Sequence, residues 1–225
     1  ECDSLESVTL PEALGITSTS MFEECEALKE ITIPGSVESI GWAAFRNCTG
    51  LQTVRFAESG SLTTIGISAF SNTGLTEVVI PDSVKSLENS SFKSCKALKS
   101  VTIGDGVRTI GEYAFDDCDS VESLTIGPAV KTIEYYAFSI YQGLDTLILN
   151  AESLQEVDDQ AFYGTKIRNL VIGKDVDSLS NEVLAGILRS SEKKDLDTLK
   201  FKGENEFTYT GEDYLVATPD GDTLF

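Results

Sequence analysis

The chain has 225 residues, of which 41% are hydrophobic, so it is long enough and apolar enough to build a core. Its 17 Lys and Arg residues stand against 37 Asp and Glu residues, and the formal net charge of −20 repels the phosphates of nucleic acids. We therefore expect no nucleic-acid partner. No apolar run is long enough to cross a bilayer, so we expect no direct membrane insertion in this segment.

The sequence contains no histidine, which is the usual general base at neutral pH and the commonest metal ligand. This excludes histidine-dependent catalytic triads and zinc hydrolases. Chance pairs of carboxylates are certain among 37 acidic residues, and no pair recurs in a pocket-forming pattern, so a carboxylate glycosidase is the weakest alternative. We predict no enzyme, no catalytic residue and no cofactor or metal site, and keep calcium binding to the acidic surface as an open alternative.

A repeat of about 23 residues begins at the N-terminus with an apolar triplet of the form L-x-x-V-x-I. The second and third residues of each triplet point to the same face of a strand, and Pro or Gly often follows. The pattern therefore predicts about nine stacked strands. The triplets are Leu5/Val8/Leu10, Leu28/Ile31/Ile33, Leu51/Val54/Phe56, Leu75/Val78/Ile80, Leu98/Val101/Ile103, Val121/Leu124/Ile126, Leu144/Leu147/Leu149, Ile167/Leu170/Ile172 and Leu196/Leu199/Phe201.

Two further anchors follow each triplet: an apolar pair such as Val37/Ile40, often followed by Gly, and then a phenylalanine that Ala usually precedes. One short strand in 23 residues leaves too little chain for a long crossover helix, so each unit must coil once and stack on the next one. The sequence predicts a mainly parallel β solenoid with short turns and one continuous core. The phenylalanines are Phe22, Phe45, Phe70, Phe92, Phe115, Phe138 and Phe162.

The five cysteines, Cys2, Cys25, Cys48, Cys95 and Cys118, each stand three residues before the first residue of a triplet. The same position holds Asn72, Tyr141 and Gly164 in other units. Cys118 in the acidic stretch 116–119 is therefore one member of the repeat, and we predict a structural thiol, with no metal or redox role. Side chains at one register point in parallel, so we expect all five cysteines to be reduced and mostly buried.

The consensus C-x-x-L-x-x-V-x-I-P-x-x-V-x-x-I-G-x-x-A-F resembles the BspA-type leucine-rich repeat of bacterial surface proteins, the 23-residue variety that is also found in treponemal proteins. The resemblance covers residues 1 to about 180 and implies a leucine-rich repeat solenoid. That family includes cell-surface and secreted proteins implicated in adhesion to host proteins or other cells, and it has no shared catalytic residues. The resemblance implies an extracellular or cell-surface location.

The repeat changes after Leu179, where Val183, Leu184, Ile187 and Leu188 fall on one helical face and predict a short helix near residues 181–190. After the ninth triplet the chain alternates apolar and polar residues around a Pro-Asp-Gly turn at 219–221, which predicts a β-hairpin-like end. We assign residues 1–202 to the solenoid and 203–225 to a C-terminal cap or an inter-repeat hairpin. Because the chain begins inside a unit, we expect a piece of a longer protein.

These observations favour a non-catalytic interaction module that takes part in adhesion or binds a protein or glycan, with a passive structural spacer as the alternative. Two groups of candidate partner-binding residues stand out. Val79, Ile148 and Val171 are apolar at outward strand positions where most units carry polar residues, and Ile148 and Val171 fall on consecutive strands. The second group, Tyr113, Tyr135 and Tyr136, lies with Tyr141 and Tyr163 on or beside the A-F turns, where half-buried packing is the alternative interpretation.

Overall fold

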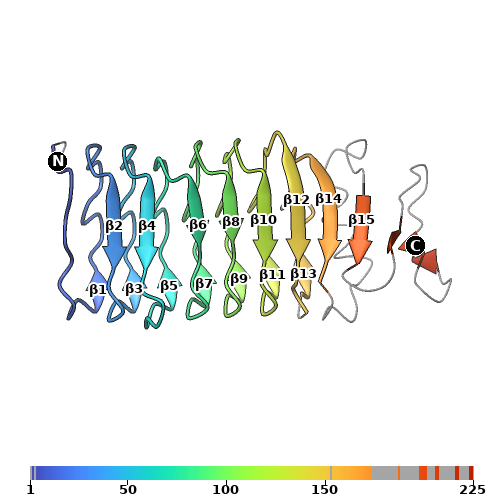
Figure 1. The fold of residues 1–225 in the computed structure, drawn as a ribbon, viewed down its shortest axis with the longest axis horizontal. Coiled ribbons are helices and arrows are strands. Elements are labelled where there is room, and N and C mark those ends of the chain that lie inside the picture. Colours follow the sequence, from blue (N-terminus) through green and yellow to red (C-terminus); the bar gives the residue numbers. More distant parts are fainter. Residues whose placement is uncertain are drawn as a thin grey trace.

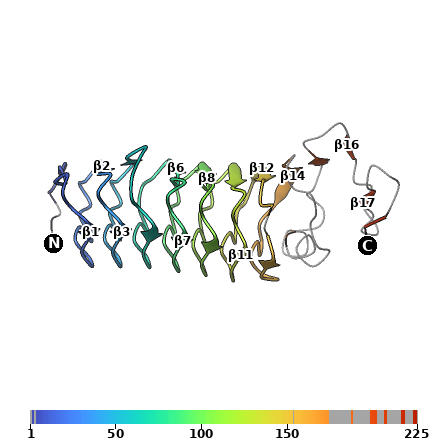
Figure 2. The ribbon, with the colours of Figure 1, turned by 90° about the horizontal axis from the view of Figure 1, so that it is seen from below.

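The computed structural model describes residues 2, 4–152, 154–173, 187, 198–201, 206–207, 216–217 and 223–224. Through residue 173 the chain winds into coils that stack side by side along the longest axis of the molecule (Figures 1 and 2). Each coil has three sides: a strand formed by the triplet, a two-residue strand formed by the apolar pair, and the A-F turn. The predicted leucine-rich repeat solenoid, mainly parallel β with short turns, is confirmed.

The triplets form the first side of the solenoid. Their strands are β2 (Glu30–Ile33), β4 (Thr53–Phe56), β6 (Glu77–Val79), β8 (Ser100–Thr102), β10 (Ser123–Ile126), β12 (Leu144–Leu149), β14 (Ile167–Ile172) and β15 (Thr198–Phe201). All of them pair in parallel, in two sheets: β2 with β4, and β6 through β15 in order. The first triplet, Leu5/Val8/Leu10, forms no strand, so the described residues carry eight of these strands where the sequence predicts nine.

The apolar pairs form a second parallel sheet, which the sequence did not predict. Its strands are β1 (Ile16–Thr17), β3 (Ser39–Ile40), β5 (Thr64–Ile65), β7 (Ser86–Leu87), β9 (Thr109–Ile110), β11 (Thr132–Ile133) and β13 (Glu156–Val157). The glycine that often follows the pair lets consecutive coils approach closely, since a Cβ on Gly41 would lie 2.4 Å from the carbonyl oxygen of Thr17.

The A-F turns form the third side, and backbone hydrogen bonds join them from coil to coil. The amide of Phe45 donates to the carbonyl of Ala69 at 2.8 Å, and the amide of Phe92 donates to the carbonyl of Ala114 at 2.7 Å. In six coils, from Phe22 to Phe138, the residues two before and two after the phenylalanine both have positive φ. This repeated left-handed backbone makes the turn sharp enough to aim each phenylalanine inward.

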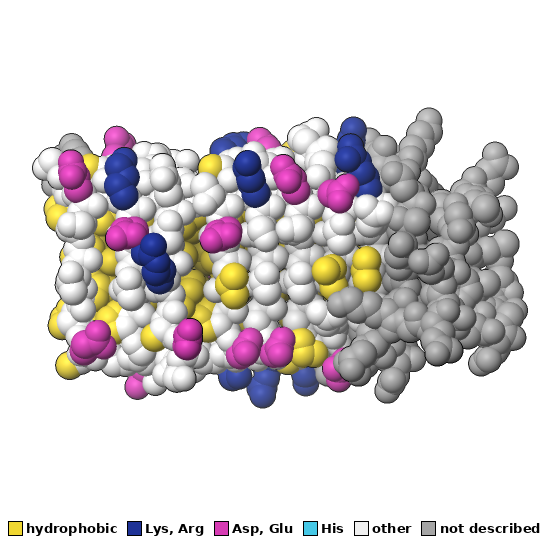
Figure 3. Space-filling model, viewed as in Figure 1, with side chains coloured by type: hydrophobic (Ala, Val, Ile, Leu, Met, Phe, Trp, Pro, Cys, Tyr) yellow, Lys and Arg dark blue, Asp and Glu magenta, His cyan; other side chains and the backbone are white. Residues whose placement is uncertain are grey.

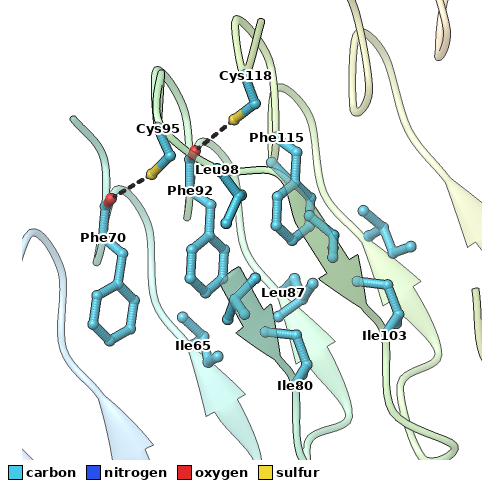
Figure 4. Packing of buried hydrophobic residues seen from close by; sticks show 14 of the residues in the cluster. Ile65, Phe70, Ile80, Leu87, Phe92, Cys95, Leu98, Ile103, Phe115 and Cys118 are labelled. Atoms are coloured by element: carbon cyan, nitrogen blue, oxygen red, sulfur yellow. Dashed lines mark hydrogen bonds between the residues drawn. The ribbon is translucent and has the colours of Figure 1, made fainter. Parts of the chain in front are cut away.

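The core runs unbroken between the three sides, and the phenylalanines form a stack through it. Six consecutive ring pairs lie with centroids 5.0–5.5 Å apart and planes within 21° of parallel. Figure 4 shows Phe70, Phe92 and Phe115 in this stack beside aliphatic side chains of both sheets. The core assignment made from the repeat therefore holds in the described coils.

The cysteine position has a structural role that the sequence showed only in part. The thiols of Cys48, Cys95 and Cys118 donate to the carbonyl of the phenylalanine one coil earlier, at 2.9, 3.2 and 3.3 Å (Figure 4). Thr165 makes the same bond to Phe138 at 2.6 Å.

The assignment of Asn72 and Gly164 to the cysteine position is wrong. Their turns are one residue shorter before the triplet, so the buried residue three after the phenylalanine is Thr73 in one coil and Thr165 in the other. None of the five cysteines forms a disulfide within the described part of the chain; Cys2 is exposed and the other four are buried.

The C-terminal part is described at separate positions only. Most of the predicted helix near residues 181–190 lies outside the described residues, although Ile187 is helical and buried. β15 pairs antiparallel with β16 (Glu206–Phe207), and β17 (Val216–Ala217) pairs antiparallel with β18 (Thr223–Leu224). The division between residues 1–202 and 203–225 stays a prediction.

Candidate binding surfaces

Four tyrosines from three consecutive coils meet on the side of the solenoid formed by the A-F turns. We call Tyr113, Tyr135, Tyr136 and Tyr163 the tyrosine cluster. Tyr113 lies 5.5 Å from Tyr135 and 5.6 Å from Tyr136 between ring centroids, and Tyr135 and Tyr136 lie 4.2 Å apart. Tyr163 stacks on Tyr136 at 5.2 Å. The first three rings are half-buried and Tyr163 is 51% exposed, so the cluster presents a continuous aromatic surface to solvent.

An ion pair adjoins the tyrosine cluster. The ammonium group of Lys93 lies 2.7 Å from a carboxylate oxygen of Asp116 and 4.7 Å from the centroid of the Tyr113 ring. The Asp116 side chain is only 8% exposed, and its other oxygen accepts a hydrogen bond from the Ser139 hydroxyl. Lys93, Asp116 and Ser139 occupy the same position, directly after the phenylalanine, in three consecutive coils, so the stacking of coils brings them together.

The backbone under the tyrosine cluster is unfavourable for bulky residues. Tyr113 and Tyr136 have φ values of 57° and 56°, in the left-handed region that side chains larger than Asn seldom occupy. The corresponding residues of other coils include Ser20, Ser68 and Ser90, which have the same backbone conformation. The fold therefore does not require tyrosine at these two positions.

The other aromatic residues noted in the sequence lie elsewhere. Tyr141 is fully buried beneath the turn, so its placement among the outward aromatics is wrong. It occupies the core-facing cysteine position, with its ring 6.3 Å from Phe138 and its hydroxyl without a hydrogen-bond partner. Trp42 is exposed, with the guanidinium of Arg46 5.3 Å from its ring centroid, and belongs to a coil nearer the N-terminus.

The second candidate surface lies on the outward face of β12 and β14. Ile148 and Val171 are register partners on these adjacent strands and are both half-buried. Thr125 and Lys200 are their partners on the outer sides, so the apolar patch is two residues wide. Val79 is 64% exposed on β6, with β8 and β10 between it and this patch. Figure 3 shows this face, on which hydrophobic side chains are few among polar ones.

A polar hollow of about 570 Å³ lies beside the Ile148–Val171 patch, near the starts of β8, β10, β12 and β14. Thr146, two residues before Ile148 on β12, contributes to its wall. Arg168 and Asp145 approach to 3.7 Å, so charges of both signs meet there. The full lining is Lys99, Ser100, Glu122, Ser123, Gly143, Asp145, Thr146 and Arg168.

In the described part of the chain, no group of three or more Cys, Asp or Glu side chains is arranged to hold a metal ion. Over the same residues, no helix has the length and apolarity needed to span a membrane. The two candidate surfaces can contact a partner through aromatic rings, hydroxyl groups and charged side chains.

Sequence reasoning grouped all four members of the tyrosine cluster beside the A-F turns and missed their contact with Lys93 and Asp116. The signal was present in the repeat, because Lys93, Asp116, Ser139 and Tyr163 all directly follow the phenylalanine of their own coils. Aligning the coils at that residue places the four side chains in one row.

Comparison with known proteins agrees with this architecture. The chain matches the family model described as BspA type leucine rich repeat region (6 copies) over residues 1–95 and 63–188. A solved structure of a leucine-rich repeat protein from T. pallidum is similar, with 23% identity, a TM-score of 0.62 and 83% of each chain covered. A leucine-rich cell surface protein from Faecalibacterium prausnitzii has 21% identity and a TM-score of 0.40, with 83% of this chain and 63% of that chain covered.

None of the curated proteins matches the sequence significantly. The likeness to the solved structures concerns the fold alone, because each identity is below 25%. The family model covers most of the chain, including every coil from β1 to β14. The protein therefore belongs to the family with BspA-type leucine-rich repeats.

Proposed function

We propose that the protein is a non-catalytic interaction module that works in adhesion at a bacterial cell surface or after secretion, and that it binds a protein or glycan through the tyrosine cluster. The cell-surface location is supported by the family, which includes surface and secreted proteins. The binding role is supported by one observation above all: four tyrosines pack into one aromatic surface, and two of them, Tyr113 and Tyr136, stand where other coils carry small residues such as Ser68 and Ser90.

The backbone at Tyr113 and Tyr136 makes this observation informative. The left-handed conformation recurs in the A-F turns of six coils and so belongs to the repeat; what is particular to Tyr113 and Tyr136 is a large aromatic side chain at a position that other coils fill with Ser or Ala. Tyrosine also supplies a large, rigid contact area at low entropic cost, which is why it is enriched at the centres of interfaces and can stack on sugars. Serine has the same backbone conformation in other coils, so the backbone does not impose tyrosine at these two positions.

The Ile148–Val171 patch is a second candidate contact surface in the same function. It is apolar at its centre, and the hollow with its hydroxyl and charged groups provides a polar edge, which is the general form of an interface. The patch is small and half-buried, and Val and Ile also suit a strand for packing reasons alone. We therefore rank it after the tyrosine cluster.

The experiment compares two variants with the unmodified protein on arrays of glycans and of extracellular proteins. The first variant combines Tyr113→Ser, Tyr136→Ser and Tyr163→Ser, which installs the residue that other coils carry at each of these positions. The second variant combines Ile148→Asp and Val171→Asp. We expect the tyrosine variant to lose binding by at least about tenfold and the strand-face variant to keep it.

Melting temperatures within a few degrees of the unmodified protein establish that both variants are folded. Loss of binding in the strand-face variant alone would move the site to the patch of Ile148 and Val171. A protein that binds nothing on either array would overturn the proposal in favour of a passive spacer.

A further inference from the structure

Three basic residues form a row on the second sheet, away from both candidate surfaces. We call Lys85, Arg108 and Lys131 the basic strip. Each directly precedes the strand of its coil, β7, β9 or β11, and all three are exposed. The amide of Arg108 donates to the carbonyl of Lys85 at 2.9 Å, and the amide of Lys131 donates to the carbonyl of Arg108 at 2.8 Å. The three cations are thus stacked with the strand spacing of about 4.8 Å.

Figure 3 shows basic side chains gathered at the lower edge of the molecule, with acidic side chains beside them. The strip has definite ends. The residue directly before the second-sheet strand is Glu38 and then Thr63 in the two coils that precede the strip. It is Gln155 in the coil that follows the strip. The strip therefore spans three coils of a chain that carries a formal charge of −20.

A row of hydroxyls runs beside the basic strip. Ser86, Thr109 and Thr132 are the next residues in the three coils and are register partners in the sheet. They are half-buried, and their hydroxyls make none of the side-chain hydrogen bonds found in the described part of the chain. Each of the three coils therefore offers one cation and one hydroxyl to an external ligand.

The basic strip is the place where three basic residues in consecutive coils lack an ion pair among the described residues; Lys29 and Lys99 also lack one but stand apart from each other. Arg46, Arg55, Lys93 and Lys96 each pair with a carboxylate in the neighbouring coil. Among the described residues no carboxylate lies within ion-pair distance of the three strip cations. Lys85 reaches only the carbonyl of Asp82, at 3.5 Å.

Asp82 and Asp105 stand three residues before Lys85 and Arg108, in the turns that lead into β7 and β9. One carboxylate oxygen of Asp82 accepts the amide of Asp105 at 2.8 Å. The residues after the strands include Glu88 and Glu134, whose carboxylates accept the amides of Ile67 and Glu112. The carboxylates of Asp82, Glu88 and Glu134 thus each accept a backbone amide, and among the described residues none of them pairs with a strip cation. Like charges opposite each other on adjacent strands are destabilising, so the row has a cost that an anionic ligand would remove.

We propose that the basic strip and its hydroxyl row bind an acidic polysaccharide that lies along the solenoid axis, with carboxylate or sulfate groups on successive sugars. The three cations favour an anionic ligand. Because each coil offers one cation and one hydroxyl, the ligand that fits best is a chain whose units each carry an acidic group and hydroxyls. This site is independent of the tyrosine cluster and adds a second ligand class to the interaction module.

An acidic peptide fits the strip less well. In an extended peptide, side chains on one face are about 6.8 Å apart, so three carboxylates would lose register with cations spaced by about 4.8 Å. A nucleic acid is disfavoured by the overall charge of −20, which repels a long phosphate backbone beyond the three coils. A short run of acidic sugars avoids both problems.

The test measures binding of the full chain to oligogalacturonate and to heparin fragments, which carry the acidic groups as carboxylates and as sulfates, at low and at physiological salt. The strip variant combines Lys85→Gln, Arg108→Gln and Lys131→Gln. The control variant combines Lys29→Gln, Arg55→Gln and Lys96→Gln, which removes two lysines and one arginine, also exposed, from the other two sides of the solenoid. We expect at least one oligosaccharide to bind, with affinity that falls as salt rises.

The strip variant should lose affinity by at least about tenfold, and the control by less than about threefold. Equal losses in the two variants, or no binding of either oligosaccharide by the unmodified protein, would overturn the proposal. Tighter binding of an oligoglutamate peptide of equal charge would overturn it in favour of a protein ligand. The tyrosine variant should bind these oligosaccharides normally, so failure here and failure of the tyrosine site can be told apart.

Discussion

Phe92 and Phe115 stack one coil apart with ring centroids 5.0 Å from each other and planes only 2° from parallel. Neither side chain is exposed to solvent. Each ring lies between those of the coils before and after it, so the stack connects the stability of one coil to that of its neighbours, as expected for a repeat protein in which each unit packs only on adjacent units.

Replacing Phe92 or Phe115 by Ala should lower the free energy of unfolding by roughly 3–5 kcal/mol, because it leaves a cavity in a close-packed core. Tyr113→Ser, on the outer side of the same turn, should cost much less, since its ring is half-buried and the new residue suits the backbone. Urea melts of the variants provide the measurement. Equally mild effects for the two kinds of substitution would contradict the core assignment.

The thiols should report on the core directly. Burial raises the pKa of Cys48 to about 12 and raises the pKa of Cys118 well above its usual range. Both groups are therefore protonated and shielded at neutral pH, whereas Cys2 is exposed. A thiol reagent should add one label to the folded protein and five under denaturing, non-reducing conditions, as read by intact mass. Fewer than five labels after denaturation would reveal a disulfide.

The sequence predicted the long-range order of the fold because every coil repeats the same buried positions. The triplets and the phenylalanines recur at intervals near 23 residues, and only stacked coils bury all of them at once. The second sheet was missed for a physical reason. Its strands are two residues long, too short to show an alternation, and coil-to-coil hydrogen bonds alone define them.

The candidate site was predicted in part. The clustering of Tyr113 with Tyr135 and Tyr136 could be expected from their positions beside consecutive A-F turns. Tyr141 was grouped with them although it holds the position of a core cysteine, and the structure buries it. The error at Asn72 and Gly164 arose because their turns are one residue shorter, a change that counting back from the triplet cannot detect.

In the shortened turn after Phe162, Thr165 occupies the position that Cys holds in other coils, and its hydrogen bonds should stabilise the fold. Thr165 donates to the carbonyl of Phe138 at 2.6 Å and accepts the amide of Tyr141 at 3.1 Å. Thr165→Val keeps the shape and removes both bonds, so it should destabilise the protein by about 1–3 kcal/mol. Thr165→Cys, the residue of other coils, should cost less than Thr165→Val in the same urea melts. Equal costs would show that this position contributes packing alone.

The ion pair of Lys93 and Asp116 should be energetically coupled. Asp116 is almost fully buried, so removing Lys93 leaves a buried charge whose remaining side-chain partner is Ser139. The variants Lys93→Ser and Asp116→Ser install the residue that Ser71 and Ser139 provide at this position in other coils. A double-mutant cycle should give a coupling of roughly 1–3 kcal/mol, reduced from the value for a fully buried pair because the Lys93 side chain is 38% exposed.

The pair of Lys96 and Asp119, 3.0 Å apart with side chains 53% and 40% exposed, is the more solvated control for that cycle, made in a background where Asp117, the second partner of Lys96, is unchanged. Its coupling should stay below about 1 kcal/mol, because water and salt screen such pairs. Equal coupling in the two cycles would mean that the burial of Asp116 contributes nothing. Coupling confined to the pair of Lys93 and Asp116 would show that the burial of Asp116 strengthens this pair, whose ammonium group also lies over the Tyr113 ring.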